Sequence, residues 1–285
     1  MICVIVSAGD FHGEIPAGFD FLIAVDGGLK HCLARRLKYD VIIGDFDSLG
    51  YVPVSENVIQ LPQDKNESDT FFAVSYAIDN RFDEIHIFGG TGGRNSHTLA
   101  NIQTLKYLAS KNIVNFMYDK EEIYTVIATP KDVDISKKSV LKVKFTEEKK
   151  GFISVFSSNP ESVVTIKGLK YELDNAVITD KYPYGLSNEF IGKESSVEVI
   201  DGTILIGYPV EYGSKGVIHC GSEYGDEPVL QENEKIQNRI ILDENNFTEN
   251  RVLNEDEFAE FLLGEELAGL EFNAEDTPES DTRWC

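Results

Sequence analysis

The chain has 285 residues, of which 26 are Lys or Arg and 49 are Asp or Glu, giving a formal net charge of −23 at pH 7. This charge excludes nucleic acids and anionic membranes as main partners, because both reward Lys and Arg. The hydrophobic fraction of 42% is ample for packed cores, and the length favours two domains over one. Residues 214–285 carry 19 acidic and only 5 basic residues, so the excess charge is concentrated there.

The four cysteines are far apart in the sequence and show no CxxC spacing, namely Cys3, Cys32, Cys220 and Cys285. This pattern favours neither a disulfide framework nor a zinc site and is typical of a reducing compartment. The first ten residues lack the basic start of a signal peptide, and no apolar run approaches the length of a membrane span. We therefore expect a cytoplasmic protein.

In the first 125 residues, strand and helix patterns alternate. Short runs of β-branched residues predict strands at 2–6, 21–25, 41–43, 57–61, 84–88 and 113–117. Helical spacing of apolar residues predicts helices at 29–37, 70–78 and 97–109. Such alternation indicates βαβ units, so residues 1–125 are predicted to form a mostly parallel, Rossmann-like α/β domain.

After residue 122 the helix signals stop and short strands follow one another. Strands are predicted at 122–128, 140–145, 151–156, 162–166 and 196–206, a spacing typical of an antiparallel sandwich. Asp201-Gly202 predicts a two-residue hairpin turn within the last of these. Residues 126–213 are therefore predicted to form a β-sandwich domain. Residues 214–285 are predicted to be an acidic extension with one amphipathic helix at 255–270 and disordered remainder.

Polar side chains follow the predicted strands of the α/β domain, at the points where these strands end. They include Ser7, Asp26, Asp45, Lys65 and Thr91. Because the carboxyl ends of parallel strands share one edge of a sheet, we expect these positions to converge on a single crevice.

Asp45 and Asp47 follow a buried strand at a spacing of two residues. Carboxylates crowded at a sheet edge repel each other unless a cation neutralises them, so a Mg²⁺ site is one interpretation and an ordinary turn is the other. Asp69 could supply a third metal ligand or could cap the following helix. Lys65 could neutralise phosphate charge or be a solvated surface lysine.

A glycine-rich loop, Gly89-Gly-Thr91-Gly92-Gly93-Arg94, lies between a predicted strand and a predicted helix. Its backbone N–H groups and Arg94 could bind phosphate, with the helix N-terminus adding a favourable dipole. The loop lacks the Lys-Ser/Thr ending of a Walker A motif, and a flexible turn is the alternative. His97 is a supporting ligand at best.

Two further segments have both a functional and an ordinary interpretation. Asp26-Gly27-Gly28 could place a carboxylate in the crevice with room for a ligand, or could be a simple βα turn. Ser187 and Asn188 could hydrogen-bond a heteroaromatic ring, although the segment 185–190 has the composition of a loop.

Together these motifs resemble the thiamine pyrophosphokinase family. The resemblance covers roughly residues 1–210 and rests on elements that occur in the family's order and spacing. They are Asp26-Gly-Gly, Gly44-Asp-Phe-Asp-Ser48, Lys65-x-x-x-Asp69, Gly89-x-x-Gly-Gly-Arg94-x-x-His97-x-x-x-Asn101 and Ser187-Asn-Glu-Phe190. The resemblance implies an enzyme that transfers pyrophosphate from ATP to the hydroxyl of thiamine, giving thiamine diphosphate and AMP.

The resemblance also implies a role for individual residues. Asp45, Asp47 and Asp69 would hold Mg²⁺, with Arg94 completing the catalytic set. Ser187 and Asn188 would contact thiamine. A homodimer with the active site at the subunit interface is also implied. The nucleotide would be bound by Asp26, Gly27, Gly28, Lys65, Thr91, Gly92, Gly93, Arg94, His97 and Asn101.

The chain departs from the family pattern at Asn66 and Ser96, where the family usually has aspartate. These losses leave open a second function, that of a non-catalytic module of the same fold that binds thiamine or its diphosphate. A phosphatase with Asp45 as its nucleophile fits less well. Such an enzyme has its Asp-x-Asp pattern at the first strand, whereas in this chain the pattern follows the third predicted strand.

Overall fold

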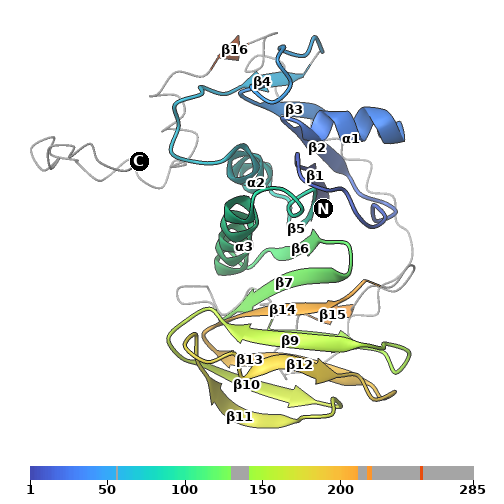
Figure 1. Cartoon of the computed structure of the whole chain (residues 1–285), viewed down its shortest axis with the longest axis vertical. Coiled ribbons are helices and arrows are strands. Elements are labelled where there is room, and N and C mark those ends of the chain that lie inside the picture. Colours follow the sequence, from blue (N-terminus) through green and yellow to red (C-terminus); the bar gives the residue numbers. More distant parts are fainter. Residues whose placement is uncertain (56, 130–140, 211–216, 220–250, 253–285) are drawn as a thin grey trace, which may run out of the picture.

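The computed structural model describes residues 1–55, 57–129, 141–210, 217–219 and 251–252 (Figure 1). The predicted acidic extension and its helix at 255–270 lie outside the described residues, except for two short strands. Within the described part, no helix is long and apolar enough to cross a membrane.

An α/β part forms the first half of the described chain. Its strands are β1 (Ile2–Val6), β2 (Phe21–Val25), β3 (Val41–Gly44), β4 (Val58–Gln60), β5 (Glu84–Phe88) and β6 (Val114–Tyr118). Its helices are α1 (Gly28–Arg35), α2 (Asp69–Asp79) and α3 (Asn95–Ser110). The six strands are parallel in the order β6-β5-β1-β2-β3-β4, so the predicted Rossmann-like sheet is confirmed.

The two faces of this sheet are covered by different helices, and strand periodicity explains which residues each helix meets. Along β1, Val4 and Val6 pack with Leu29 of α1, while Cys3 and Ile5 pack with the core that contains Phe72 of α2. Figure 1 shows α1 on one side of the sheet and α2 and α3 on the other. Residues buried on both faces explain why these strands are continuous apolar runs in the sequence.

The second half is built from antiparallel strands in two layers. The strands are β7 (Glu122–Ala128), β8 (Lys142–Phe145), β9 (Phe152–Ser157), β10 (Ser162–Lys167), β11 (Leu173–Ile178), β12 (Gly185–Glu189), β13 (Ser195–Asp201), β14 (Thr203–Pro209) and β15 (Val217–His219). A further short strand, β16 (Arg251–Val252), is parallel to β4 and is not part of the sandwich. One layer has the order β11-β10-β13-β8-β15. Facing it, β12-β9-β14-β7 continues the large sheet beyond β6, and β16 pairs with β4 at the opposite edge.

The α/β part and the β-sandwich therefore share one continuous 11-stranded sheet. A single buried cluster runs from Leu29 of α1 through Tyr118 to Phe145 and Tyr208 inside the sandwich. The ring centroids of Phe145 and Tyr208 lie 5.1 Å apart. The two rings pack edge to face, an arrangement that aromatic quadrupoles favour. This continuity makes the two halves one packed unit around a common sheet.

The predicted hairpin at Asp201-Gly202 is wrong. β13 pairs with β10 and β8 in the small sheet, whereas β14 pairs with β7 and β9 in the large sheet. Gly202 has a φ of +95°, and a side chain there would lie 2.6 Å from the Ser162 hydroxyl. The glycine thus allows a sharp bend that carries the chain from one layer to the other.

The segment expected to be a loop, residues 185–190, contains the edge strand β12. Its pairing with β9 shifts register between Gly185 and Asn188. Ser187 lies inside this bulge with a φ of +58°. Bulges re-aim side chains at sheet edges, so β12 presents Ser187 differently from a regular strand residue.

Candidate active site

A cleft of about 440 Å³ lies at the carboxyl edge of the parallel strands. Residues that follow β1, β2, β3 and β5 line it, together with the first turns of α2 and α3. In the structure, the residues that follow these strands therefore converge on one crevice, as predicted. Of the residues predicted for the site, the lining includes Asp26, Asp45, Asp47, Lys65, Asp69, Thr91, Gly93, Arg94, His97 and Asn101.

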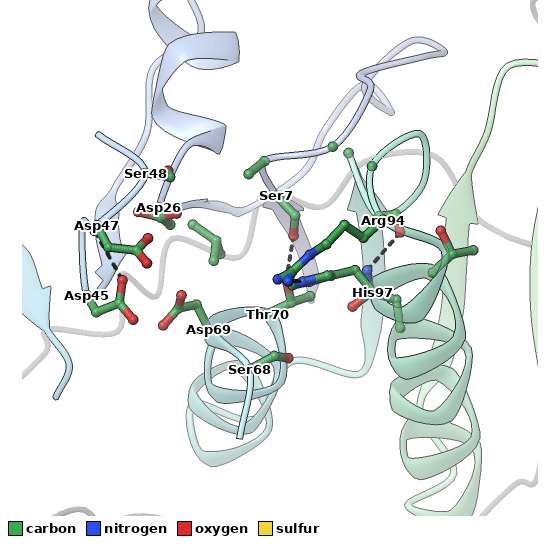
Figure 2. Close-up of a pocket in the computed structure, with 18 of the residues that line it drawn as sticks. Ser7, Asp26, Asp45, Asp47, Ser48, Ser68, Asp69, Thr70, Arg94 and His97 are labelled. Atoms are coloured by element: carbon green, nitrogen blue, oxygen red, sulfur yellow. Dashed lines mark hydrogen bonds between the residues drawn. The ribbon is translucent and has the colours of Figure 1, made fainter. Parts of the chain in front are cut away.

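One side of the cleft carries three carboxylates. One oxygen from each of Asp26, Asp45 and Asp47 lies within 4.8 Å of the others (Figure 2). Asp26 is only 8% exposed, and its Oδ1 has no hydrogen-bond partner among the described residues. A buried, unpaired carboxylate oxygen beside two further carboxylates is costly without a cation, and oxygen donors suit Mg²⁺. These residues fit a divalent metal ion.

The backbone at Phe46 explains how two carboxylates two residues apart come to face the same cleft. Phe46 is 3% exposed and packs into the core next to α1, with a φ of +62°. A positive φ is rare for a bulky side chain and is tolerated only where packing imposes it. The Asp47 N–H donates to Asp45 Oδ1 at 3.2 Å, which fixes the turn between the two acids.

Lys65 forms ion pairs with two carboxylates on the acidic side of the cleft. Its ammonium group lies 2.7 Å from Asp45 Oδ2 and 2.9 Å from Asp69 Oδ1, and it donates to the Pro62 carbonyl. Burial would raise the pKa of Asp45, but hydrogen bonds from Lys65 and the Asp47 backbone lower it below its usual value. Lys65 itself loses solvation by burial, yet its two acidic partners raise its pKa.

Asp69, predicted as the third metal ligand, faces Lys65 rather than forming part of the carboxylate trio. Its pKa is raised, first by burial and then by the charges of Asp45 and Asp26, against the lowering effect of Lys65. The alternative role predicted for Asp69, capping of α2, is filled by the neighbouring Ser68, whose hydroxyl accepts from the Phe71 N–H. Asp26, predicted only to line the crevice, takes the place in the trio.

The opposite side of the cleft is the glycine-rich loop between β5 and α3. Neighbouring groups hold this loop in place: Asn101 Nδ2 donates to the Gly90 carbonyl at 2.7 Å, and the Thr91 hydroxyl donates to Asp119. A side chain on Gly92 would lie 2.4 Å from Asp10, whereas one on Gly93 would meet nothing within 4 Å. Gly92 is therefore required by packing, and Gly93 leaves its backbone open to a ligand.

Arg94 reaches across this side of the cleft toward Ser7 and Thr70 (Figure 2). Its guanidinium donates to His97 Nε2, so His97 orients the arginine. Its other guanidinium N–H groups make no hydrogen bond to the residues that the structure describes, and a planar guanidinium can bind a phosphate through two parallel hydrogen bonds.

Gly27 and Gly28 do not line the cleft, and close packing explains both. A side chain on Gly28 would lie 1.9 Å from the Val6 carbonyl, and one on Gly27 would lie 2.9 Å from the Ser48 hydroxyl. They let α1 start directly against the end of β1. The sequence placed Ser7 at this crevice, with the other residues that follow strands, but gave it no role, and it did not single out Thr70.

Ser187 and Asn188 lie far from this cleft within one chain. β12 is eight positions from β3 in the sheet order, a span of about 38 Å at the usual strand spacing, and Figure 1 shows the two at opposite ends. Ser187 is exposed. Asn188 is buried, and its amide bonds both the N–H and the carbonyl of Tyr171, so this side chain braces the edge strand.

A Rossmann-like sheet with carboxylates on one side of its cleft and a glycine-rich loop with arginine on the other is typical of proteins that bind phosphorylated ligands. Comparison with known proteins narrows this class. The family model "Thiamin pyrophosphokinase, catalytic domain" matches residues 15–117, and "Thiamin pyrophosphokinase, vitamin B1 binding domain" matches residues 138–204. The chain belongs to the thiamin pyrophosphokinase family.

Individual relatives agree with the family models. The chain is 29% identical over 191 residues to thiamine pyrophosphokinase of Bacillus subtilis (strain 168), covering 65% of this chain and 85% of that protein. It is 25% identical over 181 residues to thiamin pyrophosphokinase 1 of Caenorhabditis elegans, covering 59% and 71%. The crystal structure of thiamine pyrophosphokinase from Bacillus subtilis aligns with a TM-score of 0.62 and 25% identity, covering 74% of this chain and all of that one.

Proposed function

We propose that this chain is a thiamine pyrophosphokinase, an enzyme that transfers pyrophosphate from ATP to the hydroxyl of thiamine. The hydroxyl oxygen forms a bond to the β-phosphorus, the bond between that phosphorus and the oxygen of AMP breaks, and the hydroxyl proton is released. The observation that carries the proposal is the cleft itself. It sets a buried Asp26 oxygen, unpaired among the described residues, and two further carboxylates opposite Arg94 and the open Gly93 backbone in a member of this family.

Asp26, Asp45 and Asp47 would hold Mg²⁺, with Asp69 nearby as a further carboxylate. Bound there, the ion would hold phosphate oxygens of ATP and draw off charge during the transfer. Arg94 and the Gly93 N–H bind the phosphates from the other side of the cleft, and Lys65 keeps the acidic side from repelling them. Phosphoryl transfers depend mainly on such positioning and electrostatic stabilisation, which this arrangement supplies.

The non-catalytic alternative is not favoured. It rested on the loss of two aspartates that the family usually has, at the positions of Asn66 and Ser96. Both side chains are exposed, and neither lines the cleft. The carboxylates that the proposal uses, Asp26, Asp45 and Asp47, are present together in the cleft.

We infer a homodimer from the position of Ser187, which we assign to thiamine binding. At about 38 Å along the sheet, Ser187 cannot meet a thiamine molecule whose hydroxyl lies at the Asp45 site of the same chain. The edge strand and its surroundings also expose large apolar side chains, namely Phe152, Tyr171, Val177, Tyr182, Tyr184 and Leu186. Such a surface is typical of an interface, and a second copy would bring its own β12 to the cleft.

We place the enzyme in the cytoplasm. Cys3 and Cys32 are buried free thiols, in keeping with a reducing compartment. ATP and thiamine would be its small-molecule partners.

Incubating the full chain with ATP, Mg²⁺ and thiamine tests the activity. We expect AMP release that requires all three components. If AMP release is absent at high enzyme concentration, the proposed function is wrong. Binding of radiolabelled thiamine without turnover would instead support the non-catalytic alternative.

A further inference from the structure

The centre of the cleft floor lies where the order of the parallel strands reverses. From β1 the chain moves outward through β2, β3 and β4, while β5 and β6 lie on its other side. Ligands of open α/β sheets bind at such a reversal. Here the Ser7 N–H donates to the Phe88 carbonyl at 2.8 Å and the Gly9 N–H donates to the Gly89 carbonyl at 2.9 Å. These two bonds join the end of β1 to the end of β5 beneath the cleft, and Ser7 forms the cleft floor.

The Ser7 side chain pairs with Thr70, from the first turn of α2. Their hydroxyl oxygens lie 2.9 Å apart, and the residues are 4% and 8% exposed. Each hydroxyl has one proton to donate, and one of the two protons makes the bond between them. The other proton has no acceptor among the described residues, and both residues line the cleft. A hydrogen-bond donor that faces a cleft bonds either to water or to a bound ligand, so the spare proton of this pair is available to a ligand.

The position of the pair indicates which ligand this is. In Figure 2, the Arg94 side chain extends toward Ser7 and Thr70, and the three carboxylates lie on the other side of this pair. An ionised phosphate carries only acceptor oxygens, so it can accept the remaining proton of the pair. Carboxylate side chains cannot donate to it, and Arg94 approaches it from a single direction. The hydroxyl pair supplies a donor from the floor that neither the metal side nor the arginine side provides.

We propose that the Ser7–Thr70 hydroxyl pair is a phosphate-binding element that donates a hydrogen bond to an oxygen of the bound triphosphate between the cation and Arg94. The inference rests on the proposed function for the identity of the ligand as a nucleoside triphosphate. Its chemistry requires only a phosphate chain with a divalent cation. The pair adds no charge, so it orients the phosphates rather than neutralising them.

Titration calorimetry of the full chain with Mg²⁺ and inorganic tripolyphosphate tests the pair directly, because this ligand carries the phosphates alone. We expect the Ser7→Ala/Thr70→Val double variant to bind about tenfold more weakly than the unmodified chain, the effect of one hydrogen bond to a charged group. Thr70→Ser keeps the hydroxyl and should bind within about twofold. The matched control is Ser75→Ala, because Ser75 is a buried serine of α2 whose hydroxyl donates to the Phe71 carbonyl.

Several results would overturn the inference. One is tripolyphosphate binding by the double variant that equals binding by Ser75→Ala, and another is no binding by the unmodified chain. If this double variant does not fold, Ser7→Ala/Thr70→Ala, which also removes both hydroxyls, takes its place, and tripolyphosphate binding by it that equals binding by Ser75→Ala rejects the inference. Failure of the proposed function is seen separately, as absence of thiamine-dependent AMP release from the unmodified chain.

Discussion

The ammonium group of Lys65 lies 2.7 Å from Asp45 and bridges it to Asp69. This bridge holds two carboxylates side by side in a cleft that Asp26 and Asp47 also line. The same groups that favour a bound cation therefore repel one another in its absence, and Lys65 offsets only part of that repulsion. The stability of the protein should accordingly depend on both pH and divalent metal.

Asp69→Asn should stabilise the metal-free protein at neutral pH. The folded state raises the pKa of Asp69 above its ordinary 3.8, so it retains this proton at pH values where the unfolded chain has lost it. Unfolding free energy therefore falls as the pH rises through the raised pKa, and the asparagine variant lacks this loss. We expect the stability difference in favour of the variant to grow from pH 4 to pH 7 in denaturant titrations.

Asp79→Asn is the control for that experiment. Asp79 ends α2 away from the cleft, and burial raises its pKa too. Its variant should show the same trend with pH, but Mg²⁺ should leave the difference unchanged. For Asp69→Asn, Mg²⁺ should narrow the difference, because a cation bound to Asp26, Asp45 and Asp47 offsets the repulsion that the Asp69 charge meets from Asp45 and Asp26 in the unmodified protein. An equal response of both variants to Mg²⁺ would show that Asp69 has no part in metal binding.

Asp47→Asn should lower turnover by at least about 100-fold, because it removes charge from the metal site at constant volume. The fold should be unaffected, since the Asp47 side chain is exposed and its backbone N–H still bonds Asp45. Steady-state kinetics with increasing Mg²⁺ and a thermal unfolding scan measure both. Asp64→Asn is the matched control, an exposed acid outside the cleft that should keep full activity. Normal turnover of Asp47→Asn at ordinary Mg²⁺ would disprove the metal assignment.

Ser96→Asp restores the aspartate that the family usually has near this position, and we expect it to change the rate less than about twofold. Ser96 is exposed in the first turn of α3 and does not line the cleft. An acidic residue there should instead raise stability by about 0.3–1 kcal/mol through the helix dipole. Kinetic assays and thermal unfolding separate the two effects. A large gain in rate would show that the departure at Ser96 costs catalysis.

Mixed dimers test the proposed interface site. Asp47→Asn and Ser187→Arg should each be inactive, the second because a cationic, bulky residue replaces a small one on β12. If Asp47 of one subunit works with Ser187 of the other, refolded equimolar mixtures contain dimers with one intact site and recover about a quarter of full activity. A mixture with no activity would show that both residues act within one subunit.

The sequence allowed most of the α/β part to be predicted, and physical reasons explain why. Strands such as Ile2–Val6 are buried on both faces and so appear as continuous apolar runs with polar residues at their ends. Convergence of Asp45, Lys65 and Thr91 follows from parallel topology alone. The sequence assigned Asp69, not Asp26, to the place beside Asp45 and Asp47, because which carboxylate joins them depends on Lys65 and on the turn at Phe46.

The β-sandwich was harder to predict from local signals. Asp201-Gly202 indicates that the chain turns, but pairing of the next strand with the same or the other sheet depends on distant residues such as Ser162. β12 was missed because its glycine, serine and asparagine have low strand propensity. The Ser7–Thr70 pair was missed because its residues are 63 positions apart, and only the fold brings them together.

The identity of the products tests the central claim most directly. Full chain with ATP, Mg²⁺ and thiamine, followed by mass spectrometry and ³¹P NMR, should yield AMP and thiamine diphosphate in equal amounts. The Asp47→Asn variant in the same reaction should yield neither above background. Formation of ADP with thiamine monophosphate, or of AMP without thiamine diphosphate, would contradict the assignment of this cleft to pyrophosphate transfer.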